Sequence, residues 1–123
     1  MQNEDAAFWE TLEALIATTE LTIDRPAGSR HPRYPDLVYP LDYGFLDGTT
    51  SMDGGGIDVW RGSLRPAALV AIALTVDLAK KDSEIKLLLG CTAGEIETVR
   101  RFHNEHAAMK AIVLRAPCAR MDT

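Results

Sequence analysis

The chain has 123 residues, of which 46% are hydrophobic and 25% are charged, values that are ordinary for a soluble globular protein. This length predicts one domain with one core, spanning residues 1–123. The formal charge of −5 argues against nucleic acid as a partner, because general binding to nucleic acid needs a basic surface. No apolar stretch is long enough to cross a bilayer, so we expect no membrane partner and a cytoplasmic location. Two cysteines, Cys91 and Cys118, are too few for a disulfide framework.

The N-terminal third is predicted to contain a helix followed by an irregular arm. Apolar residues between Phe8 and Ile16 recur at helical spacing, which predicts an amphipathic helix over residues 4–19 with Asn3 as its N-cap. Four prolines between Arg25 and Pro40 remove backbone donors and fix φ, so that segment is expected to be extended or turning.

The remaining two thirds are predicted to hold strands and a second helix. Stretches of β-branched or aliphatic residues between turn-formers predict strands at Ile57–Trp60, Ala67–Val76, Ile85–Leu89 and Ala111–Leu114. The second helix is expected from Ala93 to Lys110, because Thr92 and Glu95 match a capping box and an apolar stripe continues to Met109.

The most informative stretch runs from Tyr39 to Trp60 and reads YPLDYGFLDGTTSMDGGGIDVW. In it, Asp53 and Asp58 flank three consecutive glycines, which let the backbone turn tightly enough for both acids to face one ion. Carboxylate oxygens favour Mg²⁺ or Ca²⁺ over softer metals. The alternative is that the aspartates only hydrogen-bond the backbone of a Gly-rich turn.

Four aspartates fall at predicted strand ends or in turns, namely Asp53, Asp58, Asp77 and Asp82. Strands that turn back on one another would bring these side chains together. Carboxylates at close range repel each other, and protonation or a bound divalent cation relieves the repulsion. Metal binding is therefore the sharper hypothesis for the four residues together.

The same stretch resembles the soluble inorganic pyrophosphatases. Tyr39-Pro40, Tyr43-Gly44-Phe45, Thr50 to Gly54 and Ile57-Asp58-Val59 follow the family motifs YPxNYGY and SLDGDPxDV in order and spacing. Ile23 to Pro26 resembles the family's opening strand, Arg33-Tyr34 stands where the family has Lys-Tyr, and Asp77 and Asp82 keep the separation of its DxGxxD segment. The resemblance implies an α+β, mainly β fold: a small OB-like five-stranded β-barrel with an N-terminal and a C-terminal helix.

The resemblance also implies a metal cofactor and its ligands. Asp53, Asp58 and Asp82 would hold the activating Mg²⁺, for which Mn²⁺ is a substitute, and Asp77 and Asp24 would help to bind ions that arrive with substrate.

The implied activity is hydrolysis of inorganic pyrophosphate to phosphate by metal-activated water. Tyr43 and Asp58 would be the catalytic residues, and Arg33 and Tyr43 would bind the phosphate anion. Since the family usually assembles, a homo-oligomer is expected.

Several positions depart from the family pattern. Gly55 stands where the family has an aspartate credited with activating the attacking water, and Glu84 stands where it has a lysine. Lys86 is nearby, but we expect it to project to the same side as Glu84 only if the strand pairing shifts. The shortened arm lacks an arginine that the family carries there.

Three functions therefore stay open. The first is a magnesium-dependent pyrophosphatase of low activity. The second is a catalytically impaired protein of this fold that serves as a metal-binding, phosphate-binding or oligomeric module. The third is a hydrolase of another phosphate compound, such as a nucleotide, for which the shortened arm would make room.

Overall fold

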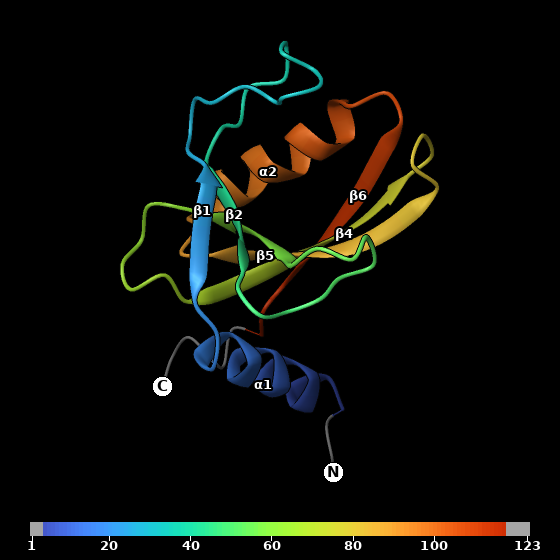
Figure 1. The fold of residues 1–123 in the computed structure, drawn as a ribbon. Helices are drawn as coiled ribbons and strands as arrows, with labels where there is room; N and C mark the ends of the chain where they lie inside the picture. Colours follow the sequence, from blue (N-terminus) through green and yellow to red (C-terminus); the bar gives the residue numbers. More distant parts are fainter. Residues whose placement is uncertain (1–3, 118–123) are drawn as a thin grey trace.

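A computed structural model describes residues 4–117 and shows a curved, mixed β-sheet with two helices (Figure 1). The elements in chain order are α1 (Glu4–Ala17), β1 (Leu21–Arg25), β2 (Asp42–Leu46), β3 (Ile57–Arg61), β4 (Leu69–Asp77), β5 (Asp82–Leu89), α2 (Ala93–Glu105) and β6 (Met109–Arg115). The strand order in the sheet is β1-β2-β3-β5-β4-β6. Neighbouring strands are antiparallel except β3 and β5, which are parallel.

The predicted five-stranded barrel is corrected by this topology. The sheet has six strands, and β1 and β6 form its two edges, so the described chain does not show barrel closure. The additional strand is β2, which lies inside the motif-rich stretch, in a part for which the sequence predicted no strand. Pairing on both sides makes it a strand, because Gly44 lies opposite Ile23 of β1 and opposite Val59 of β3. These partners are distant in sequence, so no local sequence pattern predicts the pairing.

The helix starts are as expected, and both helices end earlier than predicted. The capping box is confirmed, because Thr92 Oγ1 accepts from Glu95 N at 3.1 Å and Glu95 Oε1 accepts from Thr92 N at 2.8 Å. The apolar stripe to Met109 is wrong, since Met109 lies opposite Asp77 and begins β6. The expected N-cap, Asn3, lies outside the described residues. Among those described, no helix is long and apolar enough to cross a membrane.

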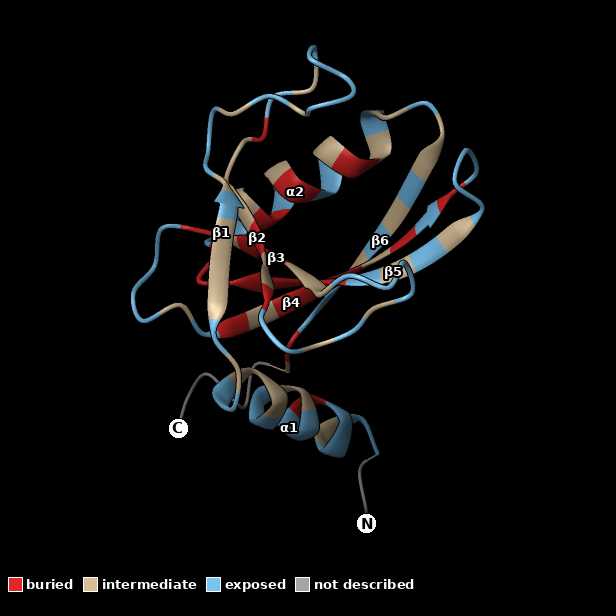
Figure 2. Ribbon diagram, in the orientation of Figure 1, coloured by how far each residue is buried: buried red, intermediate tan, exposed pale blue. Residues whose placement is uncertain are grey.

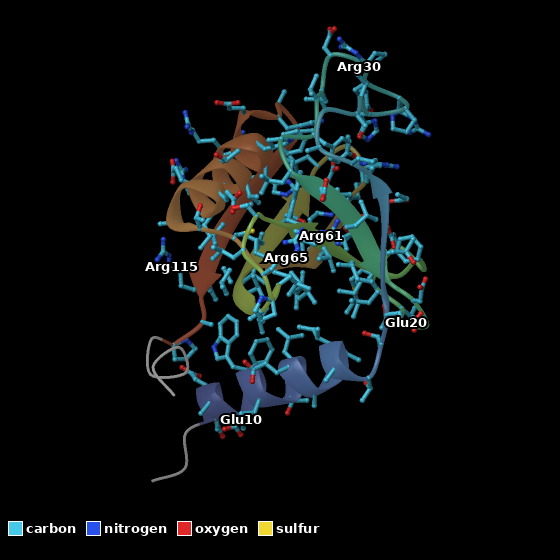
Figure 3. The ribbon with its side chains drawn as sticks, turned by 90° about the vertical axis from the view of Figure 1, so that its left-hand side faces the viewer. Glu10, Glu20, Arg30, Arg61, Arg65 and Arg115 are labelled. Atoms are coloured by element: carbon cyan, nitrogen blue, oxygen red, sulfur yellow. The ribbon has the colours of Figure 1, made fainter. Side chains whose placement is uncertain are left out.

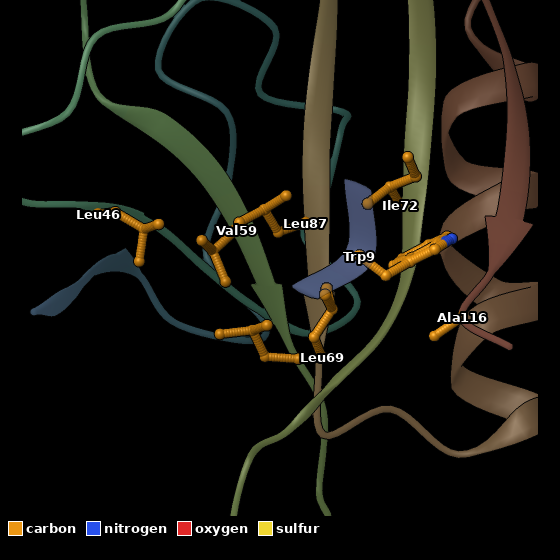
Figure 4. Packing of buried hydrophobic residues seen from close by; sticks show 8 residues of the cluster. Trp9, Leu46, Val59, Leu69, Ile72, Leu87 and Ala116 are labelled. Atoms are coloured by element: carbon orange, nitrogen blue, oxygen red, sulfur yellow. The ribbon is translucent and has the colours of Figure 1, made fainter. Parts of the chain in front are cut away.

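The core lies on both faces of the sheet, because successive side chains of a strand point to opposite faces. Red, buried segments run along the central strands between the two helices (Figure 2). The cluster on the α1 side consists of Trp9, Leu46, Val59, Leu69, Ile72, Leu87, Leu89 and Ala116 (Figure 4). The cluster on the α2 side consists of Tyr39, Trp60, Ala71, Ala73, Leu88, Cys91, Ile96 and Val99. Cys91 is a buried free thiol, and Cys118 lies outside the described residues.

The α2 face of the sheet changes from apolar to charged along its strands. Trp60 and Leu88 lie in the core beneath α2. On the same face, Asp58 precedes Trp60 by two positions, and Lys86 and Glu84 precede Leu88 by two and four. The sheet therefore carries a charged surface next to the aromatic core.

The proline-containing arm, residues 26–41, lies at the other end of the molecule from α1, as the positions of Arg30 and Glu10 show (Figure 3). It forms no helix, as predicted, and an isolated bridge pairs Arg30 with Val38. The Gly28 amide also donates to Tyr39 O at 2.8 Å. The rings of Tyr34 and His106 make an edge-to-face contact with their centroids 5.9 Å apart, so the arm reaches the end of α2.

Candidate functional site

A cleft of about 750 Å³ lies between the arm, the charged end of the sheet and the last turn of α2. Every residue to which the resemblance assigns a role lines this cleft, namely Asp24, Arg33, Tyr43, Asp53, Asp58, Asp77 and Asp82. The fold therefore gathers residues from β1, the arm and five further segments into one place. Their roles as ligands or catalysts stay predictions.

Tyr43, Asp58 and Lys86 form a hydrogen-bonded cluster on the cleft floor. The Tyr43 hydroxyl donates to Asp58 Oδ2 at 2.7 Å, and Lys86 Nζ donates to both Tyr43 Oη and Asp58 Oδ2 at 2.8 Å. Burial raises the pKa of Tyr43, which therefore stays a protonated donor. Burial disfavours the charged form of Lys86, but the Tyr43 oxygen and the Asp58 carboxylate outweigh it and raise the pKa of Lys86.

Glu84 belongs to the same cluster through its ion pair with Lys86. Lys86 Nζ donates to Glu84 Oε1 at 3.0 Å, whereas Glu84 Oε2 is buried and has no hydrogen-bond partner. Asp53 lines the same cleft, and its side chain interacts with the Glu84 carboxyl group. Burial raises the pKa of Glu84, and the contact with Asp53 acts in the same direction, while Lys86 opposes both.

The roles of Glu84 and Lys86 in this cluster were not predicted from the sequence. The expectation that Lys86 needs a shifted pairing to share a side with Glu84 is wrong. Alternate residues of a strand point to the same face, so positions 84 and 86 of β5 share one without any shift. Strand periodicity was the available signal, and it also places Asp82 on that face.

Asp53 is held by its own loop. Its Oδ1 accepts from Ser51 Oγ at 2.8 Å and from the Gly55 amide at 2.9 Å. These two donors lower the pKa of Asp53, which favours the ionised carboxylate. The alternative that this aspartate hydrogen-bonds the backbone of its own Gly-rich turn is thus confirmed for Oδ1. The Asp53 side chain also interacts with Glu84.

The other predicted acids contact the β4–β5 turn or lie at the cleft edge. Asp77 and Asp82 lie opposite each other in the hairpin. Asp77 Oδ1 accepts from the amides of Ala79 and Lys80 at 2.9 and 3.1 Å, and Asp82 Oδ2 lies 4.0 Å from Lys80 Nζ. Asp24 is an exposed residue of β1.

Positively charged groups surround the mouth of the cleft. Arg25, Arg33 and Lys80 line it together with the acids and the ring of His31. Burial lowers the pKa of His31, and the charges of Arg25 and Arg33 lower it further. The cleft therefore combines a floor rich in carboxylates with a mouth whose cations suit an anion.

The donor set fits a hard divalent cation. Within residues 4–117, no three His, Cys, Asp or Glu side chains are grouped so that they could hold a metal ion by themselves. Mg²⁺, however, is commonly bound by one or two carboxylates, with waters and substrate phosphates as its other ligands. The buried, unpartnered Glu84 Oε2 beside Asp53 provides oxygen donors of that kind.

Comparison with solved structures places the fold in the class of the inorganic pyrophosphatases. The chain is similar to an inorganic pyrophosphatase from Neisseria gonorrhoeae, with a TM-score of 0.63 and 18% identity over 83% of this chain and 84% of that chain. It is also similar to an inorganic phosphatase from Anaplasma phagocytophilum, with a TM-score of 0.53 and 15% identity over 77% and 81% of the two chains. No protein-family model and no curated protein matches the sequence. The likeness is one of fold.

Proposed function

We propose that the cleft binds a divalent cation together with a phosphate anion, and that the protein slowly hydrolyses inorganic pyrophosphate. One observation carries the proposal: the seven residues implied by the resemblance line a single cleft. The similarity in fold to a solved inorganic pyrophosphatase supports it.

The side chains of the cleft have distinct parts in this proposal. Tyr43 and Lys86 hold the Asp58 carboxylate in one orientation, and Arg33, exposed at the mouth, contacts a phosphate with its guanidinium group. Mg²⁺ held by the carboxylates of the cleft would lower the pKa of water and would neutralise charge on the leaving phosphate. The rate is low because Gly55 provides no carboxylate, and losing a general base typically costs about 10²- to 10⁴-fold.

The direct test is phosphate release from pyrophosphate with and without Mg²⁺. We expect magnesium-dependent release from the wild type and at least a roughly 10-fold loss in Asp53→Asn, because the variant removes a charged oxygen donor from the cleft. Asp36→Asn is the matched control, since Asp36 is exposed and lies in the arm away from the cleft lining. Equal rates in wild type and Asp53→Asn would reject the proposal. Faster turnover of a nucleoside triphosphate than of pyrophosphate would identify a different phosphate substrate.

A second variant adds the missing acid. A Cβ at Gly55 would lie 3.3 Å from Asp53 Oδ1, so Gly55→Asp needs only a small local adjustment. We expect the added carboxylate to raise the rate at least about 10-fold if it activates water as the resemblance implies. An unchanged or lower rate in a folded Gly55→Asp protein would count against water activation at this position.

The ion pairs of Lys86 favour a second candidate, a phosphate-binding module without turnover. Lys86 already contacts Asp58 and Glu84, which leaves fewer free carboxylate oxygens for catalysis. In that case, calorimetry would detect pyrophosphate binding in the presence of Mg²⁺, while no phosphate is released even by Gly55→Asp.

A further inference from the structure

Glu84 combines burial with an incompletely satisfied carboxylate. Its side chain is 8% exposed, Oε1 accepts from Lys86, and Oε2 is buried without a hydrogen-bond partner. A buried carboxylate oxygen that has lost water and gained no donor is unfavourable. Binding of a proton or of a positively charged ligand would therefore stabilise this oxygen.

Asp53 provides the second carboxylate next to it. Asp53 and Glu84 line the same cleft, and an interaction between their side chains contributes to the pKa shift of each. Ionised carboxylates only accept hydrogen bonds. Two such groups in contact are stable only when a proton or a cation lies between them. Both donors to Asp53 bind Oδ1, so the loop fixes the carboxylate by one oxygen.

Lys86 separates Asp58 from this pair. The ammonium group has three N–H donors, and its three partners are Tyr43, Asp58 and Glu84. Asp58 Oδ2 accepts from both Lys86 and Tyr43. The three carboxylates of Asp53, Asp58 and Glu84, set against one ammonium, leave two negative charges when all are ionised, and one divalent cation balances that charge.

We infer that Asp53 and Glu84 form the divalent-cation site of this chain, and that Lys86 takes the place of a metal ion at Asp58. This inference rests on the proposed function, which supplies the divalent cation. The resemblance implied Asp53, Asp58 and Asp82 as ligands, whereas here Glu84 is the partner of Asp53 in place of Asp58 and Asp82. Asp82 is the first residue of β5, next to the β4–β5 turn, and its ion-pair partner is Lys80.

The test is uptake of Mn²⁺ alone, measured by calorimetry and by the electron paramagnetic resonance of free Mn²⁺. The wild type binds one Mn²⁺ per chain, and Asp53→Asn and Glu84→Gln each weaken binding at least about 10-fold. Asp82→Asn is the matched control, and it changes the affinity less than about 3-fold. No uptake by the folded wild type overturns the inference, as does loss of binding in Asp82→Asn while Glu84→Gln still binds.

A second measurement uses the unmodified chain, so that a folding defect in a variant does not decide the outcome. Substoichiometric Mn²⁺ broadens the amide NMR signals of Gly55 and Ile85 before those of Ala79 and Lys81, because the former flank the proposed ligands. The reverse order overturns the inference. Mn²⁺ uptake that depends on Glu84, in a protein that releases no phosphate, supports this site and rejects only the proposed turnover.

Discussion

His103 is a buried histidine that the fold keeps neutral. Its Nε2 accepts from Trp60 Nε1 at 3.0 Å, which leaves the proton on Nδ1, 3.2 Å from Met109 Sδ. Burial lowers the pKa of His103 from 6.5 to about 3, and the charges of Lys86 and His106 lower it further. This histidine links the aromatic core to the cleft without titrating near neutral pH.

At the scale of this residue, we predict that the free energy of unfolding decreases as the pH falls. The unfolded chain protonates His103 as the pH falls below about 6.5, whereas the folded protein does so only near pH 3. The contribution is complete above pH 6.5 and is lost as the pH falls toward 3, by up to roughly 1.4 kcal/mol per pH unit. His103→Gln keeps an acceptor for Trp60 and does not titrate, so urea denaturation between about pH 4 and 7 should show a flatter profile. Parallel profiles for the two proteins would contradict the prediction.

At the scale of elements, the pairing of β1 with β2 depends on the absence of a side chain at Gly44. A Cβ at Gly44 would lie 1.8 Å from Thr22 O and 2.8 Å from Ile23 Cα, so the two backbones pass too closely for any other residue. Since β1 carries Asp24 and Arg25 to the cleft, this contact also positions part of the candidate site.

Gly44→Ala is therefore expected to destabilise the protein by at least about 3 kcal/mol, because β1 must move away from β2. Gly94→Ala is the control, since a Cβ there would come no closer than 3.9 Å to Thr92 Oγ1 and lies in α2. That change should be neutral or stabilising by up to about 1 kcal/mol. Urea unfolding midpoints compare the variants, and a Gly44→Ala protein as stable as wild type would show that the strands separate at little cost.

At the scale of the whole molecule, α1 is attached to the sheet mainly through Trp9. Trp9 is 6% exposed and packs in one cluster with Ile72 and Ala116 (Figure 4). Leu12 and Ile16 add partly buried contacts to the same cluster.

We expect Trp9→Ala to lower the free energy of unfolding by about 3–5 kcal/mol, because it removes a large side chain from the core and leaves a cavity. Phe8→Ala, at the neighbouring and 45% exposed position, should cost less than about 1 kcal/mol. Thermal and urea denaturation measure both variants. If Trp9→Ala lowers the free energy of unfolding only slightly, packing of α1 on the sheet contributes little to the stability of the core.

Local signals account for the parts of the fold that the sequence predicted. The capping box at Thr92 and Glu95 spans three residues, so its hydrogen bonds need only the local chain. The spacing of Asp53, the glycines and Asp58 similarly concerns one loop and the strand that follows it. The end of α2 was not predictable in this way, because Met109 belongs to β6 and pairs with β4, which is distant in sequence.

The amino-acid sequence by itself determined which chemistry is concentrated in the chain: hard oxygen donors between Asp53 and Asp82, basic residues in a proline-containing arm, and a resemblance confined to short motifs. Only the tertiary structure decided which of these groups meet. The parallel pairing of β3 with β5 brings Asp58 to Lys86, 28 positions away, and burial beneath the cleft leaves Glu84 Oε2 without a partner. Pairing and burial are set by neighbours distant in sequence, and they determine which carboxylates can take a cation.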